Sequence, residues 1–131
     1  MANAEHLKQL KQGVEAWNLW REKKPEIHLD LSGTNLCRVN LRNADLSSVD
    51  LSDANLRDTD LSSADLSDAN LRDSDLRDTD LSNVDLSRAD LSDVNLRWAN
   101  LISANLSSAN LSSTNLGRAT LSNANLSDVD L

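Results

Sequence analysis

Leucine recurs at every fifth position from Leu31 to Leu131 without an exception. From Thr34 onward, the residue two places before each leucine is Ala, Val, Thr or Ser, and the residue one place before it is Asp or Asn, Thr120 excepted. A period of five matches neither the 3.6-residue period of an α-helix nor the two-residue period of a strand. The chain must therefore turn every five residues if its leucines are to share one interior.

A chain that turns a corner at each pentapeptide closes a square after four of them, or twenty residues. The leucine and the small residue two places before it then alternate inward, while the other three positions face water. Successive coils would pair as parallel strands about 4.8 Å apart, and parallel crossovers prefer a right-handed superhelix. We predict a mainly β fold, a right-handed quadrilateral parallel β-helix of about five coils over residues 29–131, with core leucines such as Leu36, Leu56, Leu76 and Leu96.

The array resembles the pentapeptide-repeat family, whose consensus is A(D/N)LXX, in stretches such as ADLSDANLRDSDLRDTDL. The resemblance covers residues 30–131, about three quarters of the chain. It implies a right-handed quadrilateral β-helix with four pentapeptides per coil. The segment before the array resembles the leader helix that precedes such arrays in many cyanobacterial proteins, and reads LKQGVEAWNLWREKKPEIHLDLSGTNL.

Residues 1–28 differ from the array and are predicted to form one amphipathic helix, over residues 3–24, with a short junction. Asn3 is a candidate N-cap and Pro25 would end the helix. One apolar stripe contains Leu7, Leu10, Val14, Trp17 and Trp20. We expect the helix to cover the first coil, both its unpaired backbone edge and its apolar mouth. Alternatively, the two tryptophans anchor a partner.

The formal net charge of −8 divides into +1 over residues 1–28 and −9 over residues 29–131. Such acidity argues against direct binding to nucleic acid or to an anionic membrane, and leaves basic proteins as partners. Charges throughout residues 1–24 leave no apolar run for a signal peptide or a membrane span. Cys37 is the only cysteine, so no intramolecular disulfide forms, and we expect a cytoplasmic protein.

Outward positions twenty residues apart would stack into columns along the rod. Two neighbouring faces carry a net charge of −10, while the face with Arg57, Arg77 and Arg97 carries +2. The candidate partner surface on the acidic side consists of Asp30, Asp50, Asp53, Asp73, Asp90 and Asp93. These columns either dock a basic partner or only keep the rod in solution.

Trp98 and Ile102 are the only large apolar residues at outward positions of the array. A small exposed apolar patch can mark a contact site, although single exposed apolar residues are ordinary. Arg118, one coil later, would stack over Trp98 as a cation–π pair. Both residues are therefore candidates for a partner surface.

Catalytic constellations are missing from the sequence. His6 and His28 belong to the N-terminal region, Cys37 has no histidine partner in the array, and neither a glycine-rich phosphate loop nor a metal-spaced cluster occurs. We expect no enzyme activity, cofactor or metal. The predicted function is a scaffold that presents ordered side-chain columns for protein–protein interaction, with an unidentified partner.

The family resemblance implies an alternative function. Some pentapeptide-repeat proteins inhibit or protect DNA gyrase by resembling duplex DNA in width and charge. The acidic balance of this chain is compatible with such a DNA mimic.

The array is still in register at Leu131, so the last coil would expose leucines beside unpaired backbone groups. An open edge of this kind favours association. We expect a weak homodimer through the C-terminal end.

Overall fold

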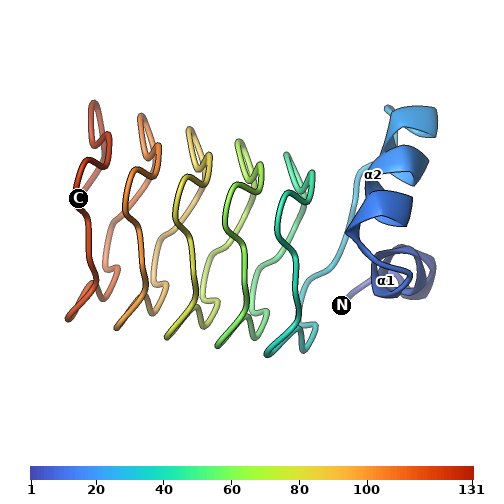
Figure 1. The fold of residues 1–131 in the computed structure, drawn as a ribbon, viewed down its shortest axis with the longest axis horizontal. Coiled ribbons are helices and arrows are strands. Elements are labelled where there is room, and N and C mark those ends of the chain that lie inside the picture. The colour runs from blue at the N-terminus through green and yellow to red at the C-terminus, as the bar shows by residue number, and fades with distance from the viewer.

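The computed structural model describes residues 1–131 as a helix pair at one end of a rod of square coils (Figure 1). Helix α1 spans Ala4–Lys11 and helix α2 spans Val14–Lys23. The coils then stack in order to the C-terminus. The predicted right-handed quadrilateral β-helix is confirmed.

Every β-bridge joins a residue to the one twenty positions later, in parallel, from the pair Asp30 and Asp50 to the pair Asn110 and Asp130. The bridging residue is always the one directly before a leucine, and no bridge extends into a longer strand. The N–H of Leu31 donates to the carbonyl of Asp50 at 2.8 Å. One coil is therefore twenty residues long, as the repeat predicted.

We name the four sides of the rod by their leucines. Face A carries Leu31, Leu51, Leu71, Leu91, Leu111 and Leu131. Face B carries Leu36, Leu56, Leu76, Leu96 and Leu116. Face C carries Leu41, Leu61, Leu81, Leu101 and Leu121. Face D carries Leu46, Leu66, Leu86, Leu106 and Leu126. The two residues after each leucine are its first and second corner residues.

The interior is a continuous column of leucines and small residues. Leu36, Leu56, Leu76 and Leu96 are at most 2% exposed, and burial of each leucine contributes about 1.5–3 kcal/mol. Inward hydroxyls are satisfied by the backbone, since Thr59 donates to the carbonyl of Leu36 at 2.9 Å. The core therefore admits polar side chains only where a carbonyl receives them.

Each corner from Leu31 to Ala124 is a β-turn closed by a hydrogen bond, as between the N–H of Ala64 and the carbonyl of Leu61 at 3.0 Å. The second corner residue has a φ between 57° and 66°, from Gly33 to Asp128. A positive φ at the third residue alone defines a type II turn and is best tolerated by Gly, Asn and Asp. The sequence pattern identified these positions as polar without revealing this backbone requirement.

The Asp or Asn before each leucine also helps to build the corner. Its Oδ1 accepts the N–H of the first corner residue, as when Asp60 accepts from Ser62 at 2.9 Å. The hydroxyl of Ser62 donates to the same oxygen at 2.6 Å. Such Asx turns hold the backbone in its bend. These side chains, predicted only to face water, are structural parts of the fold.

The single helix predicted over residues 3–24 is wrong, because the chain forms two helices. Gly13 separates them with φ 107° and ψ 162°, a conformation that glycine adopts far more readily than other residues. The apolar spacing continues across this break, so the stripe suggested one helix. Asn3 is confirmed as the N-cap of α1, since its Oδ1 accepts the N–H of Glu5 at 2.9 Å.

The apolar stripe of the helix pair faces the first coil. Leu10 and Trp17 are at most 3% exposed. Leu7, Val14 and Trp20 are partly buried and pack against the same core. The helix pair thus extends the hydrophobic interior beyond the first coil.

Polar side chains of α2 replace the backbone of a missing coil. The Oδ1 of Asn18 accepts the N–H of Asp45 at 2.8 Å, and its amide donates to the carbonyl of Asn43 at 3.1 Å. The carbonyl of Asp45 accepts from Trp17 Nε1 at 2.7 Å and from Arg21 at 2.8 Å. Asn18 therefore acts as a peptide group would in a coil below.

The cap covers the apolar mouth of the first coil as predicted, since the leucines of that coil are at most 2% exposed, but it covers the backbone edge only in part. The cap bonds the coil at Asp30 on face A and at Asp45 on face D. On faces B and C the bridging residues Asn35 and Asn40 have no bond to the cap, which reaches face C only at the carbonyl of Asn43. Val39 is 37% exposed there, whereas Thr59 directly above it is 1% exposed.

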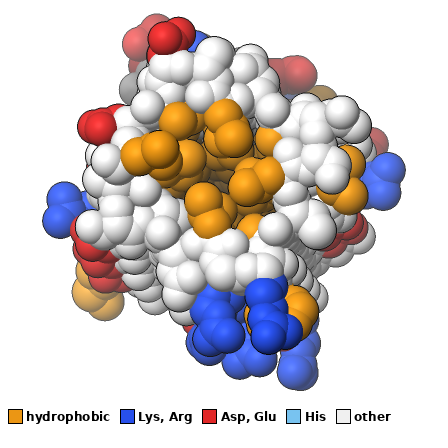
Figure 2. All heavy atoms as spheres, turned by 90° about the vertical axis from the view of Figure 1, so that its left-hand side faces the viewer, with side chains coloured by type: hydrophobic (Ala, Val, Ile, Leu, Met, Phe, Trp, Pro, Cys, Tyr) orange, Lys and Arg blue, Asp and Glu red, His pale blue; other side chains and the backbone are white.

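The last coil is open as well. Figure 2 shows apolar side chains at the centre of this end of the rod, ringed by polar and backbone atoms. Leu126 is 42% exposed and Leu131 is 84% exposed. Neither helix at the opposite end has the length and apolar character needed to cross a membrane.

Replacing Leu76 by Asp should unfold the array, because it places a carboxylate in an interior without water or a counter-ion. The control, Ser63→Asp, adds the same carboxylate at an exposed second corner residue with φ 59°. Thermal melting of both variants tests the inward position of the leucines. Equal loss of stability in the two variants would contradict it.

Replacing Asn18 by Leu should destabilise the protein, because the N–H of Asp45 loses its partner. An unsatisfied buried group of this kind costs about 1–3 kcal/mol. Leu19→Asn, on the 52% exposed side of α2, should change the free energy of unfolding little. Denaturant unfolding of both variants is the measurement, and an unchanged midpoint for Asn18→Leu would show that Asn18 closes no edge.

Candidate binding surfaces

The outermost carboxylates of face A are those of Asp53, Asp73 and Asp93. They are exposed second corner residues. The Arg72 guanidinium lies 3.3 Å from the carboxylate of Asp73 and 3.6 Å from that of Asp93. One arginine thus balances part of this predicted partner surface.

Asp30, Asp50 and Asp90 lie on the same face but are half-buried in Asx turns. The Oδ1 of Asp50 accepts from Ser52 N–H at 3.0 Å and from its hydroxyl at 2.7 Å. Hydrogen bonds from Ser32 lower the pKa of Asp30 below its ordinary value. Only the second carboxylate oxygen of these residues remains available to a partner.

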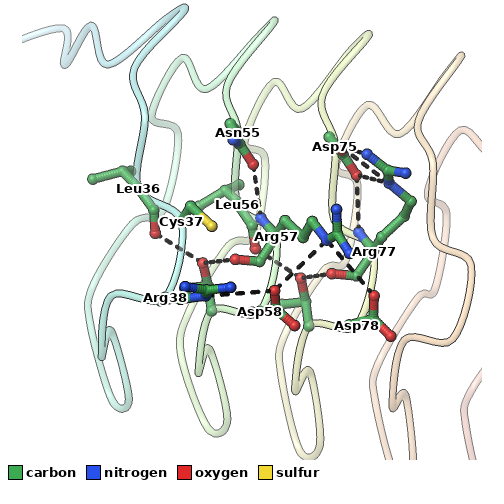
Figure 3. A network of polar contacts seen from close by, with 12 residues as sticks. Leu36, Cys37, Arg38, Asn55, Leu56, Arg57, Asp58, Asp75, Arg77 and Asp78 are labelled. Carbon is green, nitrogen blue, oxygen red and sulfur yellow. Dashed lines mark hydrogen bonds and ion pairs between the residues drawn. The ribbon is translucent and has the colours of Figure 1, made fainter.

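Face B carries an alternating network of arginines and aspartates (Figure 3). Arg57 Nε lies 3.6 Å from the Asp58 carboxylate and 3.8 Å from that of Asp78, one coil later. Arg38 Nε lies 3.9 Å from Asp58. The arginine column expected from the sequence is thus neutralised along its first coils.

Arg77 forms the tightest pair of this network. Its Nη2 lies 2.6 Å from Asp75 Oδ2 and its Nε lies 2.9 Å from Oδ1. The Arg77 guanidinium lowers the pKa of Asp75 below its ordinary value, mainly through these hydrogen bonds. A similar bond from Arg88 lowers the pKa of Asp68 on face D.

The network ends at the basic–aromatic corner, which consists of Arg97, Trp98 and Arg118. The guanidinium carbon of Arg118 lies 4.7 Å from the Trp98 ring centroid, which confirms the predicted cation–π pair. Trp98 is 50% exposed. Neither Arg97 nor Arg118 forms an ion pair with a carboxylate, unlike the other arginines of face B. Figure 2 shows basic side chains gathered at one corner, with a hydrophobic side chain among them.

Ile102 is 41% exposed but belongs to the next corner, after Leu101 on face C. The structure therefore places Trp98 and Ile102 on separate corners. No group of three His, Cys, Asp or Glu side chains is arranged to hold a metal ion.

Replacing Asp75 by Asn should keep the corner, because an amide oxygen can still accept the N–H of Arg77, but it removes the ion pair. The variant should melt below the wild type at pH 7. The folded pKa of Asp75 lies below its ordinary 3.8, so the pair stabilises above that pH and loses its effect as pH falls through the lowered pKa. The two melting temperatures should therefore converge in acid. A pH-independent difference would contradict this account.

Comparisons with known proteins agree with the geometry. The family model for pentapeptide repeats matches residues 27–62, 64–101 and 89–128, with eight copies. No curated protein matches the chain. A solved pentapeptide repeat protein from the Arabidopsis thaliana thylakoid lumen is 32% identical, with 76% of this chain and 70% of that chain covered and a TM-score of 0.74.

Two cyanobacterial structures are also similar in sequence. A pentapeptide repeat protein from Nostoc PCC 7120 is 43% identical over 76% of this chain and 70% of its own, with a TM-score of 0.32. One from Cyanothece 51142 is 30% identical over 86% of this chain and 96% of its own, with a TM-score of 0.38. The family model, the twenty-residue coil and the five-residue spacing of leucines throughout the array lead to one conclusion: this chain belongs to the pentapeptide repeat family.

Proposed function

We propose that this chain is a non-enzymatic scaffold that binds a protein partner at the basic–aromatic corner. The rod holds its side chains in fixed columns, so a partner meets a rigid surface. A rigid surface reduces the entropy that association costs. The partner would supply carboxylates to Arg97 and Arg118 and an apolar contact to Trp98.

The backbone conformation of Trp98 is the observation that carries this proposal. Its φ is 64°, in the left-handed region that bulky residues rarely adopt. Asp78 and Asp58 occupy the equivalent positions one and two coils earlier. The fold imposes this φ on every second corner residue, so the unusual feature is the bulky indole that occupies it, and Trp and Arg dominate the energetics of protein interfaces. An indole at this position therefore favours a binding role.

The acidic column of Asp53, Asp73 and Asp93 remains a second candidate surface, for a basic partner. It is supported by exposure and by its single balancing arginine, Arg72. No apolar anchor accompanies it, since Trp98 and Ile102 lie on other corners. The basic–aromatic corner combines charge with an anchor and is the better supported of the two.

DNA mimicry is supported less well. Five coils at about 4.8 Å extend roughly 25 Å. The net charge of −9 over residues 29–131 then amounts to one charge per roughly 2.7 Å, against about 1.7 Å in duplex DNA. The arginines of face B further interrupt the negative potential. The rod is thus a less dense and less uniform polyanion than DNA.

Affinity capture with purified variants tests the scaffold. A protein retained from a lysate of the source cells by the wild type should be lost with Trp98→Ser. Trp98→Ser should weaken the binding free energy by about 2 kcal/mol, which raises Kd roughly 30-fold. Ile102→Ser removes an equally exposed apolar residue from another corner and should leave retention unchanged.

Circular dichroism melting must show that both variants are folded. Retention that is equal for the wild type and Trp98→Ser would overturn the assignment of the corner. Retention lost only when Asp53, Asp73 and Asp93 are replaced by Asn would transfer the function to the acidic column.

A further inference from the structure

On the edge of the first coil that faces the cap, only about half of the backbone groups are hydrogen-bonded. Within the array, the residue before each leucine bonds the coil below it twice. Asn55, for example, donates its N–H to the carbonyl of Thr34 at 2.9 Å and accepts the N–H of Leu36 at 2.8 Å. A first coil has no coil below it, so these two groups need other partners on each face.

The cap provides those partners on two faces. On face A, Asp30 donates its N–H to His6 Nδ1 at 3.1 Å and accepts the N–H of Asn3 at 3.0 Å. On face D, Asp45 bonds Asn18 and Trp17. Both faces of the first coil are therefore paired as if a coil preceded them.

On faces B and C, no group of the cap bonds the bridging residues of the first coil. The N–H and carbonyl of Asn35 have no partner in the chain, and neither do those of Asn40. The carbonyl of Cys37 is also free, whereas the carbonyl of Arg57 above it accepts a bond from Arg38 at 3.0 Å. This open edge, residues 34–42, is a template for an added strand.

A groove lies beside the open edge. Its volume is about 500 Å³, and it separates α1 from the first coil. Ala4, Leu7 and Lys11 of α1 line one side, and Thr34 and Asn35 line the other. An extended chain paired with Asn35 could therefore place one side chain against Leu7.

The charges of the open edge are all positive. Arg38 and Arg42 are exposed, and the bridging residues Asn35 and Asn40 are neutral. The Arg38 side chain is 81% exposed and its one carboxylate contact, with Asp58, is 3.9 Å long. Lys11 adds a third positive charge inside the groove. The complementary ligand is acidic.

We propose that residues 34–42 bind an extended acidic peptide of a partner protein by strand addition. The peptide lies along the edge of the first coil on face B, where it pairs with the N–H and carbonyl of Asn35. It places an apolar side chain in the groove. Strand addition derives its affinity from backbone bonds and its selectivity from alternate side chains. A second copy of the rod does not fit, because α1 and α2 occupy the end of the rod where its coil would have to stack (Figure 1) and bond the first coil at Asp30 and Asp45.

This site adds to the scaffold proposed above and does not depend on the basic–aromatic corner. The probe is a blocked octapeptide of alternating aspartate and valine, titrated into ¹⁵N-labelled protein. Addition of the peptide should shift the amide signal of Asn35 and slow its hydrogen exchange. The amide of Asn55, which is already bonded, should not change.

Two matched double variants test the charges. Arg38→Ser with Arg42→Ser should raise the Kd roughly fivefold or more. Arg72→Ser with Arg88→Ser removes two arginines from faces A and D and should not raise it. Serine occurs in other coils at the positions equivalent to Arg42, Arg72 and Arg88. For Arg38, serine occurs at second corner residues of the neighbouring face C, such as Ser63. Both variants should therefore fold.

Four outcomes would overturn the proposal. One is unchanged exchange at Asn35 with millimolar peptide, and another is equal binding of a lysine–valine octapeptide. The third is protection that rises with protein concentration alone, which would identify a second copy as the occupant. Shifts confined to Arg97, Trp98 and Arg118 would also exclude strand addition while supporting the basic–aromatic corner, so the two proposals fail separately.

Discussion

Each coil depends on its neighbours for the hydrogen bonds of its bridging backbone. Within one coil the backbone closes only its corner turns, and the remaining bonds link residues about twenty positions apart. Stability is then the sum of interfaces between adjacent coils. The ends of the rod are consequently the places where the fold needs an additional solution. Helix α2 supplies one solution by presenting side chains in place of a peptide backbone.

Sequence periodicity was sufficient to predict the coil, its register and the stacking of outward columns. Leucines at every fifth position share one interior only if the chain turns at each pentapeptide. The same twenty-residue coil predicted that Arg118 lies over Trp98. The helix break at Gly13 could not be predicted this way, because the apolar spacing is continuous through it. The roles of Asn18 and Arg21 also escaped prediction, since a polar residue on a helix carries no mark of the carbonyl that it will meet.

Charge columns alone were a poor guide to the binding surfaces. The arginines of face B look like one basic stripe in sequence, yet Arg57 and Arg77 are neutralised by adjacent aspartates. Among the arginines of face B, only Arg97 and Arg118 form no ion pair with a carboxylate, and there an indole accompanies them. Contacts between consecutive coils, which the pattern of one column does not reveal, thus decide which charges a partner would meet.

The corner geometry has a consequence for the low isoelectric point of the chain. All seventeen aspartates of the array lie either directly before a leucine or at a second corner residue, and none is a first corner residue. The residue directly before the leucine must supply the acceptor of the Asx turn, and the second corner residue must tolerate a positive φ. Aspartate satisfies both requirements. Much of the acidity is therefore inherited from the way the backbone bends, and a pentapeptide solenoid can become a polyanion without any selection for an electrostatic partner.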